Sequence, residues 1–322
     1  MPASQNKKLY NHWKPSSKPY NFFGDYLWDK YKCRVLKLPV SAGFTCPNKD
    51  GAIGYNGCIF CAEDGSGSPS VKISADIVKQ MENAKAGFQR SEADTKYIAY
   101  FQAYSNTYSS IENLKKFYDK ALIVKDVIGL SVATRPDCLP DNVLDLIAGY
   151  SRDNFELCLE IGMQTMHEKT LTFLNRGHSH KTTKDAVLRA AKRNIPVCVH
   201  IILGIPGESW NDMMETAKEV SSLPVSGVKI HHLHVIKGTT LEKYYNNGKA
   251  GVLSLKEYVS TICDFLERLR PDILIHRLIG DRSAVSLVAP KWGMQKGTVL
   301  KAIDDEFAKR CTHQGFLLED VK

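Results

Sequence analysis

The chain has 322 residues, of which 43% are hydrophobic and 24% are charged, and its formal net charge is +8. This composition is typical of a globular protein with one large domain or two ordinary ones. No window approaches the roughly 18–20 apolar residues that a membrane helix needs, and the polar, basic N-terminus lacks the apolar stretch of a secretory signal. We therefore expect a cytoplasmic protein with no membrane association.

The first 50 residues are rich in positive charge and contain only three aspartates. Their basic residues are Lys7, Lys8, Lys14, Lys18, Lys30, Lys32, Arg34, Lys37 and Lys49. A basic end on a near-neutral body suggests a surface that binds phosphate groups. A solvated lysine-rich tail explains the same pattern equally well.

From about residue 32, apolar β-branched runs alternate with segments of helical period. We predict strands at Arg34–Val40, Tyr97–Phe101, Val127–Ala133, Phe155–Ile161, Val197–Leu203 and Val228–Leu233, and a later one at Ile273–Leu278. A strand–helix spacing of about 30–40 residues is typical of right-handed βαβ units. On pattern alone, six such units fit either an incomplete parallel barrel or an open doubly wound sheet.

Two segments show clear helical starts. Asp141, directly after Pro140, is the expected cap of the first. Ser254 and Glu257 form the pair of a capping box at the start of the second. We divide the chain into a basic N-terminal extension (1–32), a main β/α domain (33–240) and a C-terminal extension of helices and strands packed on it (241–322).

The strongest local signal is a loop directly after the first predicted strand, where active sites of β/α folds lie. It contains Cys46, then eleven residues, then Cys58-Ile59-Phe60-Cys61. Clustered cysteines in a cytoplasmic protein more often bind metal than form disulfides. Structural iron–sulfur and zinc sites use four protein ligands, whereas three leave one metal position open. We therefore predict a [4Fe–4S] cluster on Cys46, Cys58 and Cys61.

The alternative is a zinc site completed by Cys33 or by a histidine. Cys33 lies one strand-length before Cys46, about 20 Å away at roughly 3.3 Å per residue, which makes it a poor fourth ligand. The other five cysteines are isolated and mostly lie in apolar runs, which is typical of buried thiols.

Phe60 between the last two cysteines resembles the Cys-x-aromatic-Cys ending of the radical S-adenosylmethionine (SAM) signature. The long first gap is similar to that of the YtqA/YhcC (MnmL-type) family, which is related to the radical SAM domain of the elongator catalytic subunit. The similarity runs from about Arg34 to about Phe307. The motifs, in order, are AGFTCPNKDG, YFQAYSNTY, ATRPDCLPD, LEIGMQT, NRGH, HIILGIPGE, KIHHLHVIKGT, GD and APKWGMQK.

This resemblance implies a partial (β/α)6 TIM-like barrel that binds a [4Fe–4S] cluster and SAM. The open iron would chelate SAM, and one electron, from a reduced flavodoxin- or ferredoxin-type donor, would split it into methionine and a 5′-deoxyadenosyl radical. The resemblance also implies a substrate, a wobble uridine of tRNA whose 5-substituent is remodelled. Rival hypotheses are a radical SAM enzyme for a small metabolite or a protein side chain, and a non-catalytic zinc or RNA-binding protein.

The resemblance also implies positions for the SAM-binding side chains. Phe60 would pack on the adenine, and Gln102, Ser105 and Asn106 would lie near the methionine amino group, although the common Gly-Gly-Glu is absent there. Glu160 and Gln164 would lie near the ribose and amino-acid moiety. The alternative for Glu160 is an ion pair with Arg135, itself a cofactor-binding candidate. Gly204 and Gly207 would let backbone pass close to the adenine, or form only a turn.

Three histidines, His231, His232 and His234, close the sixth predicted strand. Because side chains alternate along a strand, we expect His231 to point away from the other two, which argues against a second metal site. The resemblance implies that His231 or His234 lines the substrate cavity with Lys229. Further candidates are Arg176, His178, Arg277 and Asp281. Basic side chains among these suit a phosphate or carboxylate, and a surface role is the alternative for each.

Overall fold

The computed structural model describes residues 18–63, 65, 76–88, 94–280 and 282–321. Lys7, Lys8, Lys14 and Asp281 lie outside these ranges. In the described residues, no helix is long and apolar enough to cross a membrane.

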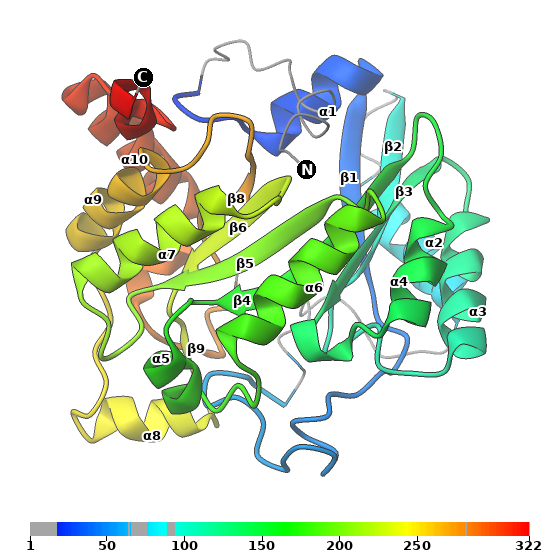
Figure 1. Cartoon of the computed structure of the whole chain (residues 1–322), viewed down its shortest axis with the longest axis horizontal. Helices are drawn as coiled ribbons and strands as arrows, with labels where there is room; N and C mark the ends of the chain where they lie inside the picture. The colour runs from blue at the N-terminus through cyan, green and yellow to red at the C-terminus, as the bar shows by residue number, and fades with distance from the viewer. Residues whose placement is uncertain (1–17, 64, 66–75, 89–93, 281, 322) are drawn as a thin grey trace.

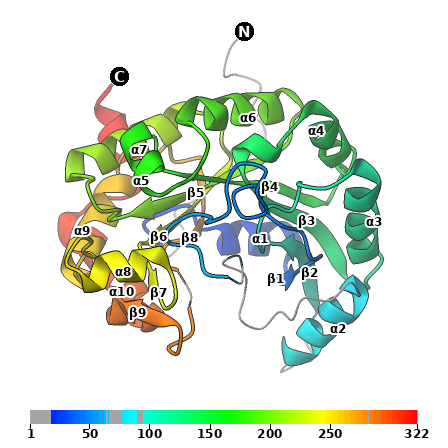
Figure 2. The same cartoon turned by 90° about the horizontal axis from the view of Figure 1, so that it is seen from below.

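Seven parallel strands form one sheet in the order β1-β2-β3-β4-β5-β6-β8. They are β1 (Arg34–Val40), β2 (Thr95–Phe101), β3 (Val127–Thr134), β4 (Glu156–Gln164), β5 (Val197–Leu203), β6 (Gly227–His232) and β8 (Leu274–Arg277). The sheet curls into a half-barrel with helices on its outer face (Figures 1 and 2). This sequential order confirms the partial barrel and excludes the doubly wound sheet, in which the strand order reverses.

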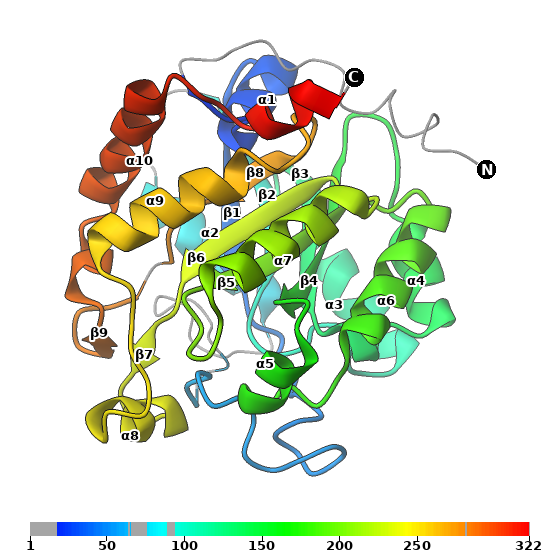
Figure 3. The same cartoon turned by 60° about the vertical axis from the view of Figure 1, so that its left-hand side comes forward.

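The outer helices are α2 (Ile77–Phe88), α3 (Ile111–Leu122), α4 (Asp141–Ala148), α6 (His180–Lys192), α7 (Trp210–Ser222), α9 (Leu255–Leu266) and α10 (Lys296–Arg310). Helix α9 lies between α7 and α10 (Figure 3), and its Ser254–Glu257 capping box is present. Helix α4 differs from expectation. Its N-cap is Pro140, and Asp141 is its first residue.

Short elements surround the end of the barrel where the strands finish. They are α5 (Glu168–Phe173), α8 (Thr240–Asn246) and the antiparallel pair β7 (Val235–Ile236) and β9 (Leu287–Ala289). Helix α1 (Phe23–Tyr31) lies at the opposite end (Figure 1). It contacts both edge strands, β1 and β8, and Phe23 stacks on His276 of β8 with ring centroids 4.0 Å apart. Residues 18–31 are therefore part of the folded barrel and not a solvated tail.

Alternation along the strands separates an apolar outer face from a polar inner face. In β4, for example, Leu157, Leu159 and Ile161 belong to the core under the helices, whereas Cys158 and Glu160 face the interior. The same pattern repeats in the other strands. Inward-facing side chains include Lys37, Tyr100, Ser131, His200, Lys229 and His276.

Two sequence predictions need correction at this level. Strand β4 continues to Gln164, so Glu160 lies within the strand and not at its end. Strand β8 pairs with β6, so a segment beyond residue 240 completes the sheet. The three-part division of the chain stays a prediction.

Candidate active site

The three predicted ligands, Cys46, Cys58 and Cys61, line one cavity of about 680 Å³ inside the half-barrel. They lie in the loop after β1, at the end where the parallel strands finish (Figure 1). Backbone hydrogen bonds from Ile59 to Leu174 and from Leu241 to Ile59 join this loop to the segments around α5 and α8. Cys33, before β1, does not line the cavity.

The spacing of these thiols suits a cluster better than one zinc ion. Zinc holds thiolates at about 2.3 Å, so sulfurs around one ion lie within about 4.6 Å of each other. The three sulfurs do not form a set within 4.8 Å of one another. An iron–sulfur cluster is larger, because several metal ions share the thiolates.

Polar groups surround Cys58 in particular. Arg176 Nη1 donates to Cys58 Sγ at 3.2 Å, and Asn48 Nδ2 lies 3.7 Å from the same sulfur. Arg176 Nη2 also donates to the carbonyl of Gly162 at 2.9 Å, and a Cβ on this glycine would lie 3.1 Å from that nitrogen. Arg176 was a candidate for the lining of the substrate cavity; it lines this cavity and also contacts Cys58, a predicted cluster ligand. Sequence reasoning missed Asn48.

Several predicted SAM-binding side chains line the same cavity, namely Phe60, Gln102, Ser105, Arg135, Glu160 and Gln164. Three buried atoms among them, Ser105 Oγ, Arg135 Nη1 and Gln164 Oε1, have no hydrogen-bond partner in the described structure. Buried polar atoms need partners, so these side chains fit a polar ligand beside the cysteines. The cavity would hold the cluster on the cysteines and SAM against these groups.

Three predicted SAM-binding residues lie outside the lining of this cavity. The Asn106 side chain donates to the Ala133 carbonyl at 2.9 Å. Gly204 has a φ of +80°, and a Cβ on it would strike Leu253; Gly207 has a φ of +88°. Both glycines allow the turn before α7, which Ser209 caps with a full capping box. Their predicted contacts with SAM stay predictions.

Glu160 is the centre of a buried network that sequence reasoning missed. Its Oε1 accepts from Lys37 Nζ and Ser131 Oγ, both at 2.7 Å. Its Oε2 accepts hydrogen bonds from Tyr100 Oη at 3.0 Å and from Lys229 Nζ. The same oxygen lies 2.6 Å from His200 Nε2. The expected Glu160–Arg135 ion pair is wrong, because Arg135 instead binds Asp137 through two hydrogen bonds of 2.9 Å.

The two ammonium groups fix the charge state of Glu160. Burial alone would raise the pKa of this carboxyl, but Lys229 and Lys37 outweigh burial and hold the pKa well below its usual range. Burial and the nearby Lys229 lower the pKa of His200 to about 4. At neutral pH, Glu160 is therefore a carboxylate and His200 a neutral imidazole.

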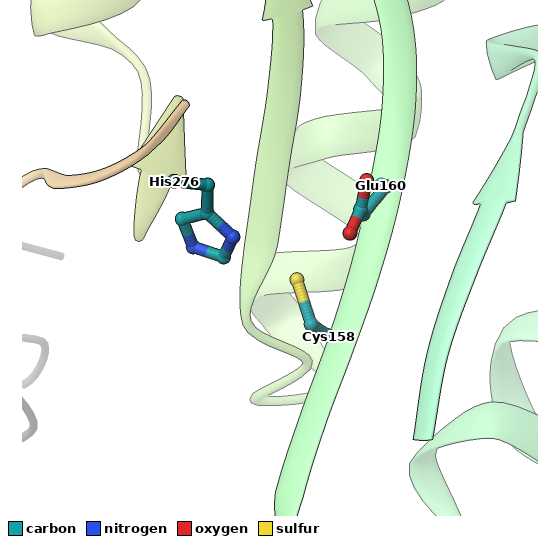
Figure 4. Close-up of side chains that lie close together, drawn as sticks. All are labelled: Cys158, Glu160 and His276. Carbon is teal, nitrogen blue, oxygen red and sulfur yellow. The ribbon is translucent and has the colours of Figure 1, made fainter. Parts of the chain in front are cut away.

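Cys158, Glu160 and His276 bring their ligand atoms within 4.8 Å of one another, the spacing of a metal site (Figure 4). However, Lys37 Nζ lies 2.7 Å from Glu160 Oε1 and 3.4 Å from His276 Nδ1. A cation there would have to displace this ammonium group. We interpret the group as part of the lysine–carboxylate network.

The histidines after Ile230 differ from expectation. His231 and His234 both line the cavity, with ring centroids 6.0 Å apart. His232 packs instead against Trp292. The expectation that His231 points away from His234 is wrong, because β6 ends at His232 and strand alternation does not extend further. Burial lowers the pKa values of His232 to about 3 and of His234 to about 2, so both are neutral at pH 7.

The cavity lining is strongly cationic. It includes eight basic side chains, Lys37, Lys49, Arg135, Arg176, Lys229, Arg277, Arg282 and Lys296. Glu160 is the one carboxylate among the described lining residues. Outside the cavity, the described N-terminal lysines are partly neutralised, since Lys18 pairs with Asp304 at 2.7 Å and Lys30 with Glu156.

A half-barrel with three cysteines in the loop after its first strand defines a class of enzyme, and comparison with known families agrees. The radical SAM superfamily model matches residues 51–220, and the Radical_SAM C-terminal domain model matches residues 225–309. The chain belongs to the radical SAM superfamily. It is therefore a radical SAM enzyme that uses a [4Fe–4S] cluster and SAM and needs an electron donor. This result replaces the non-catalytic zinc alternative.

Within the superfamily, the chain is similar to uncharacterized protein YtqA of Bacillus subtilis (strain 168), with 40% identity over 300 residues and 93% of each chain covered. It is 35% identical to protein YhcC of Escherichia coli (strain K12) over 284 residues, 88% of this chain and 91% of YhcC. The resemblance to the YtqA/YhcC family is confirmed. The structure of archaeal Methanocaldococcus infernus Elp3 has a similar fold, with a TM-score of 0.65 and 16% identity, covering 88% of this chain and 64% of that chain.

Proposed function

We propose that the protein remodels the 5-substituent of a tRNA wobble uridine, converting 5-carboxymethylaminomethyluridine to 5-aminomethyluridine. The observation that carries this proposal is the cavity, which combines the three cysteines with eight basic side chains and one carboxylate. The thiolate-bound cluster, which is an anion, and the carboxylate of SAM would account for part of this positive charge. A nucleotide substrate that carries both a phosphate and a carboxylate accounts for more of it.

The resemblance to the MnmL-type family and the elongator catalytic subunit supports the same substrate. We place the reaction in the cytoplasm, with a reduced flavodoxin- or ferredoxin-type protein as electron donor. The basic N-terminal segment adds a candidate surface for tRNA, although Lys7, Lys8 and Lys14 lie outside the described residues.

The proposed chemistry balances without a further oxidant. When bound, the reduced cluster supplies one electron that splits SAM into methionine and a 5′-deoxyadenosyl radical. The substrate N–CH₂–carboxylate carbon then loses a hydrogen atom to give 5′-deoxyadenosine. Loss of one electron, which returns to the iron–sulfur centre, leaves an imine. Water cleaves the imine to the 5-aminomethyl group and glyoxylate.

Different residues of the cavity would hold the cluster, bind SAM and contact the substrate. Cys46, Cys58 and Cys61 hold the cluster, and Gln164 and Arg135 offer unpaired buried atoms to SAM. Glu160 holds Lys229 within the barrel, and His231 and His234 lie in the same cavity. As a neutral imidazole, His234 can form a hydrogen bond to the substrate or to the water that cleaves the imine.

Comparison of tRNA nucleosides from cells with and without this gene tests the proposal. We expect 5-carboxymethylaminomethyluridine to accumulate in cells that lack the gene, and 5-aminomethyluridine and its products to decrease. Complementation with the normal gene should restore the pattern, whereas the Cys58→Ala variant should not. An unchanged nucleoside profile would exclude this substrate and leave a small metabolite or a protein side chain.

A further inference from the structure

Arg277 carries a positive charge in the cavity that no described residue balances. It is the last residue of β8, and its side chain lines the cavity. Its Nε atom is buried and has no hydrogen-bond partner. Among the described residues, no carboxylate forms an ion pair with this guanidinium. The residue as a whole is half-buried, and a guanidinium that is partly withdrawn from water without a carboxylate partner is suited to an external anion.

The groups around Arg277 leave its charge uncompensated. Tyr100, His200, His231 and His234 line the same cavity as Arg277, and none of them is a carboxylate. Burial, with Arg277 next in effect, lowers the pKa of His231 well below its usual range. The imidazoles are therefore neutral, and a neutral imidazole can donate one hydrogen bond to an anion without adding charge.

The one carboxylate among the described lining residues of the cavity already has a full set of partners. Glu160 is completely buried, and its two oxygens contact Lys37, Ser131, Tyr100, His200 and Lys229. Two ammonium groups balance its single negative charge and leave one positive charge over. Glu160 therefore cannot serve as the counter-ion of Arg277, and the interior stays net positive.

We propose that Arg277, with His231 and His234, forms a subsite for the carboxylate of the substrate. This inference rests on the proposed function and assigns the carboxymethylamino carboxylate to Arg277. A guanidinium binds a carboxylate through two parallel hydrogen bonds, which fixes the orientation of the bound group. The carbon that loses hydrogen is bonded to this carboxylate, so holding the carboxylate also positions that carbon.

Binding of a small probe tests the subsite without tRNA. The probe is N-benzylglycine, and N-benzylmethylamine is the matched compound without a carboxylate. Calorimetry on cluster-loaded enzyme with SAM should detect binding of the acid and not of the amine. Arg277→Gln should weaken binding of the acid roughly tenfold or more. Arg277→Lys keeps the positive charge but lacks the paired N–H donors of a guanidinium, so it should have a smaller effect.

Lys256→Gln is the control, because Lys256 is exposed and does not line the cavity. It should change binding of the acid less than about twofold, as expected for a screened surface charge. Iron content and thermal unfolding show whether each variant is folded, and Arg277→Lys provides the test if Arg277→Gln does not fold. Equal binding of acid and amine, or equal losses in the Arg277 and Lys256 variants, would overturn the subsite.

A second measurement separates this inference from the proposed function. With tRNA that carries 5-carboxymethylaminomethyluridine, Arg277→Gln should raise KM more than it lowers kcat. Turnover of this tRNA with an unchanged KM in the variant contradicts the subsite while the proposed function stands. The acid probe could bind selectively at Arg277 while the tRNA nucleosides of cells lacking the gene stay unchanged. That result would support the subsite and show that it binds the carboxylate of a different substrate.

Discussion

Arg176 donates a hydrogen bond from Nη1 to Cys58 Sγ over 3.2 Å, and its backbone carbonyl accepts from Arg135 Nη2 at 2.6 Å. A guanidinium is thus held against a cysteine that we assign to the cluster. Hydrogen bonds and positive charge near cluster sulfurs favour the reduced, more negative state. We therefore predict that Arg176 raises the reduction potential of the cluster.

Replacing Arg176 by glutamine should make the midpoint potential of the cluster more negative. Loss of one hydrogen bond and one nearby charge corresponds to a shift of roughly 20–60 mV. A redox titration followed by electron paramagnetic resonance measures this shift. Arg268→Gln is the control, because Arg268 packs on Trp210 outside the cavity. Equal potentials in the two variants, with full iron content in both, would contradict this role.

Each cluster cysteine should be individually necessary. Anaerobic reconstitution of the normal protein should give about four irons and four sulfides per chain and a broad absorption near about 400 nm. Cys46→Ala, Cys58→Ala and Cys61→Ala should each lose the cluster, whereas Cys33→Ala should retain it. Stoichiometric zinc without a reconstituted cluster is the result that would contradict the assignment.

Glu160 should be important for stability. Glu160→Ala would leave the ammonium groups of Lys37 and Lys229 buried without a carboxylate, at a cost of about 3–5 kcal/mol. Urea unfolding at pH 7 measures the change in the free energy of unfolding. The exposed Glu215→Ala variant should stay within about 0.5 kcal/mol of the normal protein. Equal stabilities of the two variants would show that the Glu160 network does not stabilise the fold.

Stability should also fall in mildly acidic solution. The pKa of His200 is about 4 in the folded protein, against about 6.5 in an unfolded chain. Between these values the unfolded state binds the proton that the folded state excludes, so the free energy of unfolding decreases as the pH falls. The loss between pH 7 and pH 5 is about 1–2 kcal/mol for such a histidine. Urea unfolding measures the free energy of unfolding at pH 7 and pH 5, and the decrease between them should be smaller in His200→Gln than in the normal protein. An equal decrease in both proteins would refute this explanation.

The sequence predicted the seven strands of the main sheet well because apolar β-branched runs mark them. β1 and β5 begin and end at the predicted residues, whereas β4 begins one residue later and ends three residues later than predicted. The three cysteines were recognised from their spacing, which depends on neighbouring residues alone. The role of β8 was harder to predict, because its pairing with β6 joins segments far apart in the chain.

The interior network was missed for the same reason. Lys37 was counted with the basic N-terminal segment, although its place in the middle of an apolar strand was a signal that it faces the barrel interior. Its contact with Glu160 joins β1 to β4, which no local pattern reveals. His234 was assigned by strand alternation, which fails after the last paired residue. The contact of Arg176 with Cys58 joins two loops and likewise depends on the fold.

The proposed reaction is tested most directly in the purified enzyme. Cluster-loaded protein would be incubated anaerobically with SAM, dithionite and tRNA from cells that lack the gene, and the nucleosides, 5′-deoxyadenosine and glyoxylate would be quantified by mass spectrometry. We predict loss of 5-carboxymethylaminomethyluridine with equal gains of 5-aminomethyluridine, glyoxylate and tRNA-dependent 5′-deoxyadenosine. Formation of 5′-deoxyadenosine with unchanged tRNA nucleosides and no glyoxylate would contradict the proposal.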